Sequence, residues 1–426
     1  MRLLRPLRTR EVALLWGGLS LSAVGDQLYA VALSWIAVSV FGTAAGYLTA
    51  LQAAVVLLAA LGIGRWADRW DAQGSLIGAD LARTAALLAL VGSWLASGQP
   101  GALPLIAAVV ILASGQAVFQ PALQLVLPQL VSEPGLLPAT NALMDATDRS
   151  ARLLGPGLIA LLAGVLPTVH FLSLDAASFL LSATAVLLIR RRRKLPVAAP
   201  RRDEGIWASI GRGARAMSAH RLLGYVLRTT AMVNGAWYAA YFLALPLLIE
   251  QRGLEGPGGT GLGAYGLIIA AYGCTNLAAT VLLGGRPMPA RPQFQMFGGG
   301  LIVGAGTVLL GLAALLPTAW TLPGLAAAAA FGAVGGPMKD IPVAVLRQTR
   351  LAARDLAAGM RAYIAANSAG ALVTMLLAPS LLHRFGTATV ILGCGALLAA
   401  TGLFGLLWHR DWQEEPADRH RVVSGD

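Results

Sequence analysis

The sequence predicts an all-α membrane protein with twelve transmembrane helices in two six-helix bundles. Three features predict it: twelve long apolar stretches, their division six and six around the basic run Arg190 to Lys194, and a charged content of only 12% in 426 residues. A stretch of 18 or more apolar residues is long enough to cross about 30 Å of hydrocarbon as a helix. The charged share is about half that of a typical soluble domain. Almost the whole chain is therefore expected to lie in a membrane.

The apolar stretches give the expected helices in chain order. In the first half they cover residues 12–41, 44–64, 76–95, 103–126, 139–165 and 169–189. In the second half they cover residues 222–249, 261–283, 296–316, 320–346, 356–382 and 387–408. The expected organisation is an N-terminal six-helix bundle at 1–189, a basic linker at 190–220, a C-terminal six-helix bundle at 221–412 and a tail at 413–426. The linker is expected to act as a tether with a short surface helix.

The distribution of basic residues predicts the orientation. If the chain starts in the cytoplasm, 24 of the 32 Lys and Arg residues fall in cytoplasmic segments, six lie within spans, and only Arg252 and Arg384 lie on the outer side. This is the positive-inside bias. The first apolar run is too long for a cleavable signal peptide. We therefore expect a multi-pass protein of the bacterial inner (plasma) membrane with both termini cytoplasmic.

Several function classes lack their sequence signatures. Neither of the two lysines, Lys194 and Lys339, follows a glycine-rich phosphate loop, so ATP is not expected to be the direct energy source. The five histidines make no metal-ligand cluster. Cys274 and Cys394 lie inside expected spans and are interpreted as packing residues. The net charge of +12 follows from topology rather than from binding nucleic acid. We expect neither an enzyme nor a bound cofactor or metal.

The loop after the second expected helix carries a recognisable motif. It reads Gly64-Arg65-Trp66-Ala67-Asp68-Arg69-Trp70-Asp71 and resembles the signature G-x-L-A-D-R-x-G-R-R of the major facilitator superfamily. Three further segments resemble the proton-linked exporters that include macrolide efflux pumps and the enterobactin exporter: Gly25-Asp26-Gln27, Gly78-Ala79-Asp80-Leu81-Ala82-Arg83 and Phe119-Gln120-Pro121. The resemblance implies the major facilitator fold, alternating access, and an antiporter that uses the proton gradient as its energy source.

The resemblance also implies a cytoplasmic gate. Asp68 would interact with the N-terminal end of the eleventh helix, where unpaired backbone N–H groups favour an anion. Arg69 would join this latch, and Asp80 and Arg83 would belong to the same gate. The sequence departs from the signature directly afterwards, because Asp71-Ala72-Gln73 replaces the usual glycine and basic pair.

Asp26 is the candidate for proton coupling. It lies near the middle of the first expected span, with no basic residue within one helical turn. An ionisable side chain at that depth is costly and is usually paired, functional or exposed to a cavity. A carboxyl group that takes up and releases a proton is what proton-coupled export needs. The alternative is a protonated Asp26 that hydrogen-bonds to a neighbouring helix.

The fifth expected span carries four further charges. Asp145 with Arg149, and Asp148 with Arg152, have the i, i+4 spacing that lets opposite charges meet on a helix. Mutual neutralisation favours a structural or gating role. The alternative is that Asp148, Arg149 and Arg152 take part in proton transfer or in binding an anionic substrate.

Polar and aromatic residues at helical spacing indicate a cavity wall. In the superfamily, helices one, four, seven and ten line the central cavity. The candidates for substrate contact are Tyr29, Gln116, Gln120, Gln124, Asn234, Trp237, Tyr238, Tyr241 and Asn367. A mixed aromatic and amide wall suits a bulky amphiphile, since binding sites are mostly apolar with a few polar groups. Hydrogen bonding between helices explains the glutamines nearly as well.

The sequence therefore predicts a monomeric secondary transporter that exports hydrophobic or amphiphilic compounds in exchange for protons. A dedicated exporter of a siderophore or other metabolite is the nearest alternative. The charges do not decide, because six basic residues within spans are matched by six Asp residues. A lipid flippase is the next alternative. The short outer loops disfavour a receptor or scaffold. The expected partners are a small amphiphilic substrate, protons and membrane lipid.

Overall fold

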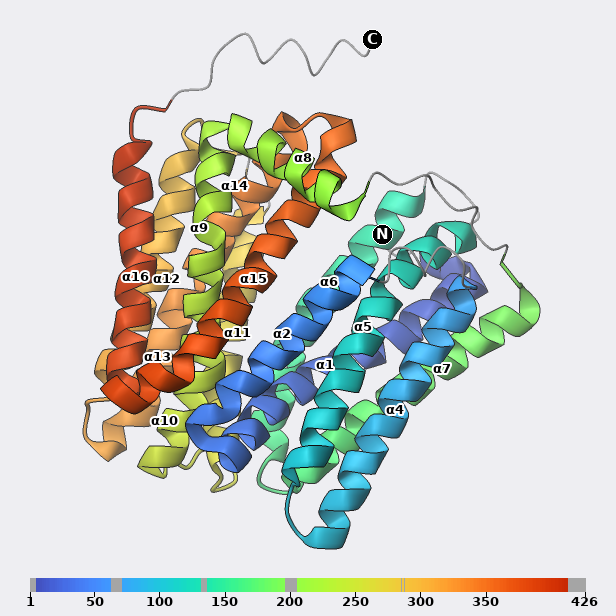
Figure 1. Ribbon diagram of the computed structural model, residues 1–426, viewed down its shortest axis with the longest axis horizontal. Coiled ribbons are helices and arrows are strands. Elements are labelled where there is room, and N and C mark those ends of the chain that lie inside the picture. Colours follow the sequence, from blue (N-terminus) through green and yellow to red (C-terminus); the bar gives the residue numbers. More distant parts are fainter. Residues whose placement is uncertain are drawn as a thin grey trace. The chain divides into compact units, whose positions relative to one another are not determined.

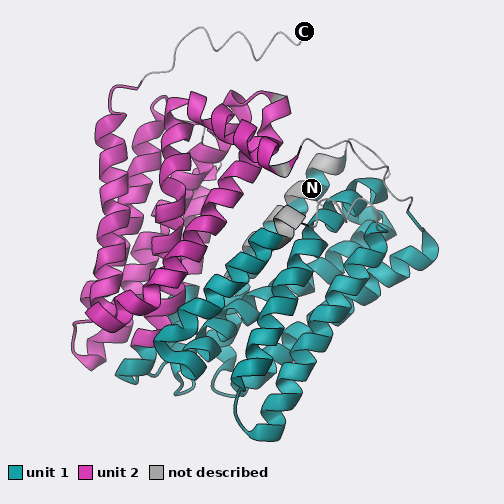
Figure 2. Ribbon diagram, in the orientation of Figure 1, with its two compact units in different colours: residues 1–202, 249–270 teal, residues 203–248, 271–426 magenta. Residues whose placement is uncertain are grey.

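The regular structure of the described residues is entirely helical (Figure 1). The computed structural model describes residues 5–62, 71–131, 136–195, 205–284, 286 and 288–412. The chain divides by packing into two compact units, which Figure 2 shows in teal and magenta. Unit 1 holds residues 1–202 and 249–270, and unit 2 holds residues 203–248 and 271–426. The bundle boundaries expected from the sequence stay a prediction, since this division follows contacts and places residues 249–270 in unit 1.

The helices of unit 1 follow the expected spans closely. They are α1 (Arg10–Phe41), α2 (Ala45–Gly62), α4 (Ala72–Ser97), α5 (Ala102–Leu130), α6 (Leu137–Leu162) and α7 (Thr168–Arg192). Local chemistry explains the bounds of α4. The Asp71 side chain accepts a hydrogen bond from the Gln73 N–H at 3.1 Å, which caps the first turn. Gly98 ends the helix with φ of 77°, a left-handed conformation that glycine adopts without strain.

Unit 2 contains the linker helix and most of the second set of spans. Its helices are α8 (Ile206–Ala219), α9 (Arg221–Tyr238), α12 (Pro292–Ala313), α13 (Thr318–Ala333), α14 (Gly335–Arg350), α15 (Ala353–Phe385) and α16 (Thr387–Trp408). Two helices, α10 (Leu245–Arg252) and α11 (Gly261–Gly284), have residues in both units. The expected short helix in the linker is confirmed by α8. Arg361 of α15 donates a hydrogen bond to Ser209 Oγ of α8 at 2.5 Å, which ties the linker helix to unit 2.

Ten stretches of the described chain are long and apolar enough to cross a membrane. The first of them, Arg10–Leu58, contains two helices, α1 and α2. Helix α6 is 26 residues long but is not among the ten, because its central part carries Asp145, Asp148, Arg149 and Arg152. With α2 and α6 counted, the twelve spans expected from the sequence are present. The predicted all-α, multi-pass membrane fold is therefore confirmed.

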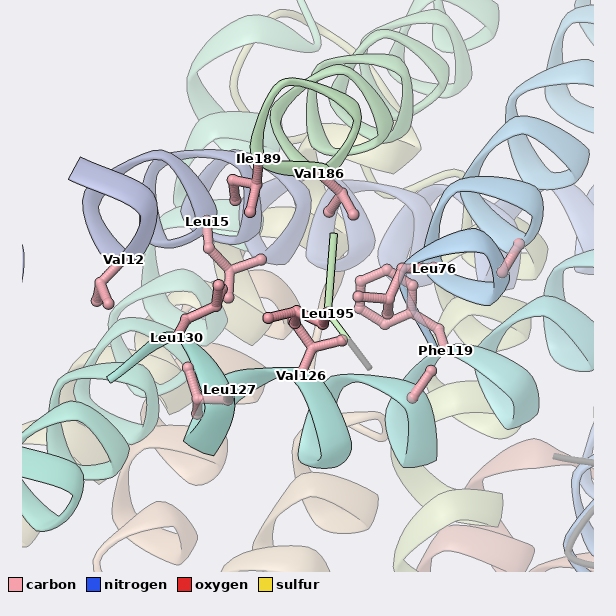
Figure 3. Packing of buried hydrophobic residues seen from close by; sticks show 12 residues of the cluster. Val12, Leu15, Leu76, Phe119, Val126, Leu127, Leu130, Val186, Ile189 and Leu195 are labelled. Atoms are coloured by element: carbon pink, nitrogen blue, oxygen red, sulfur yellow. The ribbon is translucent and has the colours of Figure 1, made fainter. Parts of the chain in front are cut away.

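A cluster of buried apolar side chains packs helices of unit 1 against one another (Figure 3). Val12 and Leu15 of α1, Leu76 of α4, Val126 of α5 and Val186 of α7 belong to one buried cluster. Lipid chains are as apolar as these residues, so dense van der Waals packing rather than transfer from water holds such helices together. Hydrogen bonds of a buried polar side chain add to this packing. Fully buried Gln73 donates to the Arg193 carbonyl at 3.1 Å and accepts from the Leu195 N–H at 3.0 Å, which fixes the chain after α7.

Two of the long spans in the second half are interrupted. Between α9 and α10, residues 239–244 form a π-helical segment, a rare feature that often marks functional sites. Between α13 and α14, the helix is broken at Val334. The Asn276 side chain of α11 donates to the Ala333 carbonyl at 3.1 Å, which satisfies a backbone acceptor at this break. Irregular backbone at membrane depth requires such internal partners.

Candidate functional site

A cluster of charged residues is buried inside unit 1. Asp80 and Arg83 come from α4 and Asp175 comes from α7, and their exposed fractions are 0%, 2% and 0%. The Arg83 Nη1 and Asp80 Oδ1 atoms are 3.4 Å apart, so the two side chains form an ion pair. Arg83 is the twelfth of the 26 residues of α4, about 17 Å along the helix from its start. A buried ion pair near the middle of a span is costly to form, which makes it a functional candidate.

Two aromatic rings and one glycine hold the Arg83 side chain. Its guanidinium carbon lies 4.9 Å from the centre of the Phe119 ring and 5.0 Å from that of Phe179. These distances are typical of cation–π interactions. A Cβ at Gly115 of α5 would lie 2.7 Å from Arg83 Nε, so only glycine leaves room for the side chain at this position. The guanidinium is therefore held between α5 and α7 as well as by Asp80.

Asp26 joins the same cluster from α1. It is the seventeenth of the 32 residues of α1 and is partly accessible, unlike Asp80 and Asp175. The neighbouring Gly25 packs against α7 so closely that a Cβ there would collide with Ser178 Oγ and Asp175 Oδ1. Asp26 interacts electrostatically with Arg83, Asp80 and Asp148, and Asp175 interacts with Asp26. Together, Asp26, Asp80, Arg83 and Asp175 form what we call the unit 1 charge cluster.

The charge cluster is incompletely satisfied by hydrogen bonds. Ser178 donates to the carbonyl of Asp175 at 2.8 Å and approaches Asp175 Oδ1 at 3.2 Å. Among the described residues, Asp175 Oδ2, the Arg83 Nε and Nη2 atoms, and the hydroxyl of Tyr29 have no hydrogen-bond partner. Buried polar atoms normally have partners, and exceptions often have a functional reason. Three carboxyl groups also interact with a single guanidinium, so full ionisation of the cluster would leave two negative charges in excess.

The structure thus places the predicted coupling and gate residues of unit 1 as follows. Asp80 and Arg83, which were expected at the cytoplasmic gate, lie in the interior of unit 1 together with Asp26. Their part in a gate stays a prediction. Asp68 and Arg69 lie outside the described residues. Asp148 and Arg152 are exposed on α6, and the side chains of Asp145 and Arg149 lie outside the described set. Asp175 was missed as a site residue, since a lone acid in an apolar stretch gives no sign of its neighbours.

The expected substrate contacts in unit 1 differ in accessibility. Gln120 and Gln124 of α5 are exposed and Gln116 is partly buried, and the spacing of four places all three on one helix face. Tyr29 is only 7% exposed, so it faces the interior of unit 1 beside Asp175 and Asp26. The exposed glutamines keep the cavity-lining interpretation open, and contact with substrate stays a prediction for all four residues.

In unit 2, two of the expected substrate contacts serve the packing of α9 on α15. The Thr230 hydroxyl donates to Asn367 Oδ1 at 2.6 Å, and the Asn234 amide donates to the Asn367 carbonyl at 3.3 Å. A Cβ at Gly370 would collide with the Ala231 carbonyl, so the two backbones are in close contact there. Asn234 and Asn367 therefore have a structural role, and their contact with substrate stays a prediction.

The expected aromatic contacts belong to a larger cluster. The Trp237 ring centre lies 5.3 Å from that of Tyr238, 5.5 Å from Tyr241, 5.4 Å from Phe242 and 6.0 Å from Tyr272. Tyr241 is 1% exposed, whereas the other four rings are partly accessible. Phe242 and Tyr272 were missed, because Phe242 lies within the π-helical segment, where regular helical spacing does not hold, and Tyr272 comes from α11. We call Trp237, Tyr238, Phe242 and Tyr272 the aromatic cluster.

An exposed ion pair lies on α14 of the same unit. Lys339 Nζ and Asp340 Oδ1 are 3.4 Å apart, and the two side chains are 30% and 62% exposed. Both residues line a pocket of about 50 Å³ between α9, α12, α14, α15 and α16. Drug-sized ligands occupy pockets of about 300–1,000 Å³, so this pocket has room only for water or a small part of a ligand.

The comparisons with known proteins agree with this architecture. The sequence pattern of the Major Facilitator Superfamily matches residues 15–346. A search of curated proteins finds no match. Among solved structures, a POT family transporter in complex with a thioalcohol-conjugated peptide has a TM-score of 0.69 at 13% identity, covering 94% of this chain and 96% of that chain. The POT family transporter PepTSo has a TM-score of 0.69 at 13% identity, covering 94% and 98%.

A peptide transporter POT in complex with sulfate has a TM-score of 0.69 at 14% identity, covering 95% of this chain and 94% of that chain. Identities this low show a shared fold and carry no substrate over to this chain. The family match covers most of the chain, and it points to a transporter rather than an enzyme. This chain belongs to the Major Facilitator Superfamily.

Proposed function

We propose that the chain is a proton-coupled exporter of hydrophobic or amphiphilic compounds that works by alternating access. The observation that carries the proposal is the unit 1 charge cluster, in which Asp80 forms an ion pair with Arg83 and the carboxyl groups of Asp26 and Asp175 interact electrostatically with the same guanidinium. Within the superfamily, we place the chain with the proton-linked exporters on the sequence motifs around Asp26 and Asp80. We further propose that it lies in the bacterial plasma membrane as a monomer, with both termini cytoplasmic.

Charge balance supports proton coupling. An uncompensated buried charge costs several kcal/mol in a protein interior. Two excess negative charges are therefore expensive in the charge cluster, and binding of protons removes them. Asp26 is the accessible acid of the cluster, so it is the entry point for protons, while Asp80 and Asp175 are enclosed. A proton on Asp26 changes the charge that Arg83 experiences, which links protonation to the packing of α1, α4, α5 and α7.

The accessible polar and aromatic faces support an amphiphilic substrate. Unit 1 presents accessible amide groups at Gln120 and Gln124. Unit 2, taken by itself, presents the large, partly accessible rings of the aromatic cluster. Groups of both kinds are typical of sites for compounds with an apolar body and a few polar groups. Export rather than uptake is proposed on the resemblance of the motifs to proton-linked exporters.

Transport by purified protein in liposomes tests the proposal. A fluorescent lipophilic cation is followed with and without an imposed pH gradient, for the wild type, Asp26→Asn and the control Asp411→Asn, which removes an exposed carboxylate beyond α16. We expect gradient-driven movement in the wild type and the control, and its loss in Asp26→Asn. Exchange of substrate without a gradient should survive in Asp26→Asn. Full gradient-driven pumping by Asp26→Asn would show that the charge cluster takes no part in the coupling mechanism.

A further inference from the structure

We propose that Asp340 and the aromatic cluster form a binding site for the cationic, aryl-bearing part of a substrate, with Lys339 as the internal counter-ion that this cation displaces. The inference rests on the proposed transport function and narrows its substrate class to organic cations. All of its residues lie in unit 2.

The position of Asp340 requires a water-accessible space in front of it. Asp340 lies ten residues before the end of α14 at Arg350, which corresponds to about 15 Å along the helix axis. Its side chain is 62% exposed. Charged side chains at such depth in a membrane face protein or water and avoid lipid. An exposed carboxylate at this depth is therefore placed to meet water or a dissolved ligand rather than lipid.

The aromatic cluster lies beside this carboxylate. A Cβ at Gly336, one helical turn before Asp340 on α14, would lie 3.8 Å from the Tyr272 hydroxyl, so Tyr272 of α11 packs against this part of α14. Tyr272 also interacts electrostatically with Asp340, and its ring centre is 6.0 Å from that of Trp237. The Tyr238 and Phe242 rings lie 5.2 Å apart and both contact Trp237. Partly accessible aromatic faces next to a carboxylate favour a cation with an apolar or aryl surface, because the ring faces and the carboxylate are both electron-rich.

The two interruptions of the long spans frame this site. The π-helical segment at 239–244 follows directly after Trp237 and Tyr238 and contains Phe242. The break at Val334 comes shortly before Asp340 on the same span. Asn276 is bonded to the Ala333 carbonyl and lies one helical turn after Tyr272 on α11. A ligand at the aromatic cluster therefore contacts the elements at which both spans deviate from regular helix.

Lys339 has the features of a displaceable counter-ion. Consecutive residues point about 100° apart around a helix, so Lys339 and Asp340 face different neighbours. Lys339 interacts with Tyr363 of α15, whereas Asp340 interacts with Tyr272 of α11. The ion pair is 3.4 Å long and both partners are accessible, so its strength is modest. A ligand cation competes with Lys339 for the carboxylate, whereas a neutral aryl ligand does not.

This competition predicts effects of opposite sign for two adjacent residues. Binding of tetraphenylphosphonium to purified protein in detergent, without any pH gradient, is measured by equilibrium dialysis. Asp340→Asn should weaken binding by about tenfold or more. Lys339→Gln should tighten it by about 2- to 5-fold, as expected for removal of a partly exposed ion-pair partner. Trp237→Leu should weaken it by about 3- to 30-fold. Asp411→Asn, the matched removal of an exposed carboxylate elsewhere, should change nothing.

A neutral ligand of similar shape distinguishes the effect of ligand charge on binding from the effect of ligand shape. Triphenylphosphine oxide should be bound more weakly by Trp237→Leu but equally by the wild type, Asp340→Asn and Lys339→Gln. The proposal is overturned if tetraphenylphosphonium does not bind the folded wild type, if the two charge variants change affinity in the same direction, or if neither changes it. Failure of gradient-driven transport with the opposite-sign pattern intact would reject the proposed coupling and leave this site standing.

Discussion

Removing the guanidinium of Arg83 tests the energetics of the charge cluster. Arg83 is 2% exposed, forms an ion pair with Asp80 and lies between two aromatic rings. In Arg83→Met, the apolar stem is kept but the charge is lost. Breaking a buried pair from one side costs about 3–5 kcal/mol, because the remaining charge is uncompensated. Each lost cation–π contact contributes about 0.5–2 kcal/mol of that effect. We expect a loss of about 3–5 kcal/mol in the free energy of unfolding.

A double-mutant cycle isolates the pair from general disruption. Asp80→Asn and Arg83→Met are measured singly and together by equilibrium unfolding with denaturant in mixed micelles. In the double variant no charge of this pair is left buried, so its destabilisation should be smaller than the sum of the two by about 1.5–3 kcal/mol. A coupling below about 0.5 kcal/mol would mean that the two residues act independently, which would refute the reasoning.

Three further predictions concern packing, helix breaks and pH. Gly115→Ala places a Cβ 2.7 Å from Arg83 Nε and should lower the free energy of unfolding by about 1–3 kcal/mol, measured by the same denaturation. Asn276→Ala leaves the Ala333 carbonyl at the helix break without its donor and should cost about 1–3 kcal/mol; an unchanged stability would argue against this bond. Burial, with nearby arginines, lowers the pKa of His409 just beyond α16 to about 4. Because the ordinary value is about 6.5, stability should be full above pH 6.5 and fall as the pH drops toward 4, with this slope absent from thermal unfolding curves of His409→Phe.

The course of the chain through the membrane was predictable from the sequence. In hydrocarbon the backbone groups must be satisfied internally, as they are in a helix, so long apolar stretches predict spanning helices. The predicted bounds agree with the helices to within a few residues. Helix α6 was also predicted as a span, although charged residues occupy its central part. The break at Val334 was less evident, although Gly332, Gly335 and Gly336 are concentrated around it.

The composition of the site was predictable only in part. Asp26 was predicted as a candidate from its depth and from the motif around it, because a charge in the middle of a span is costly whatever surrounds it. The association of Asp175 with Arg83, and of Tyr272 with Trp237, depends on the rotation and crossing of helices that are far apart in sequence. Spacing along one helix carries no information on these contacts. Asn234 and Asn367 were predicted as substrate contacts, a role that stays a prediction, and the structure shows them hydrogen-bonded to each other where α9 packs on α15.

Proton movement driven by substrate tests the central claim most directly. Liposomes that contain the purified protein and a luminal pH-sensitive dye are given a substrate gradient but no pH gradient. The account predicts that the wild type moves protons against the direction of substrate flow and shifts the luminal pH, and that Asp26→Asn moves substrate without any shift. Substrate movement by the wild type with no change in luminal pH would contradict proton coupling by this protein.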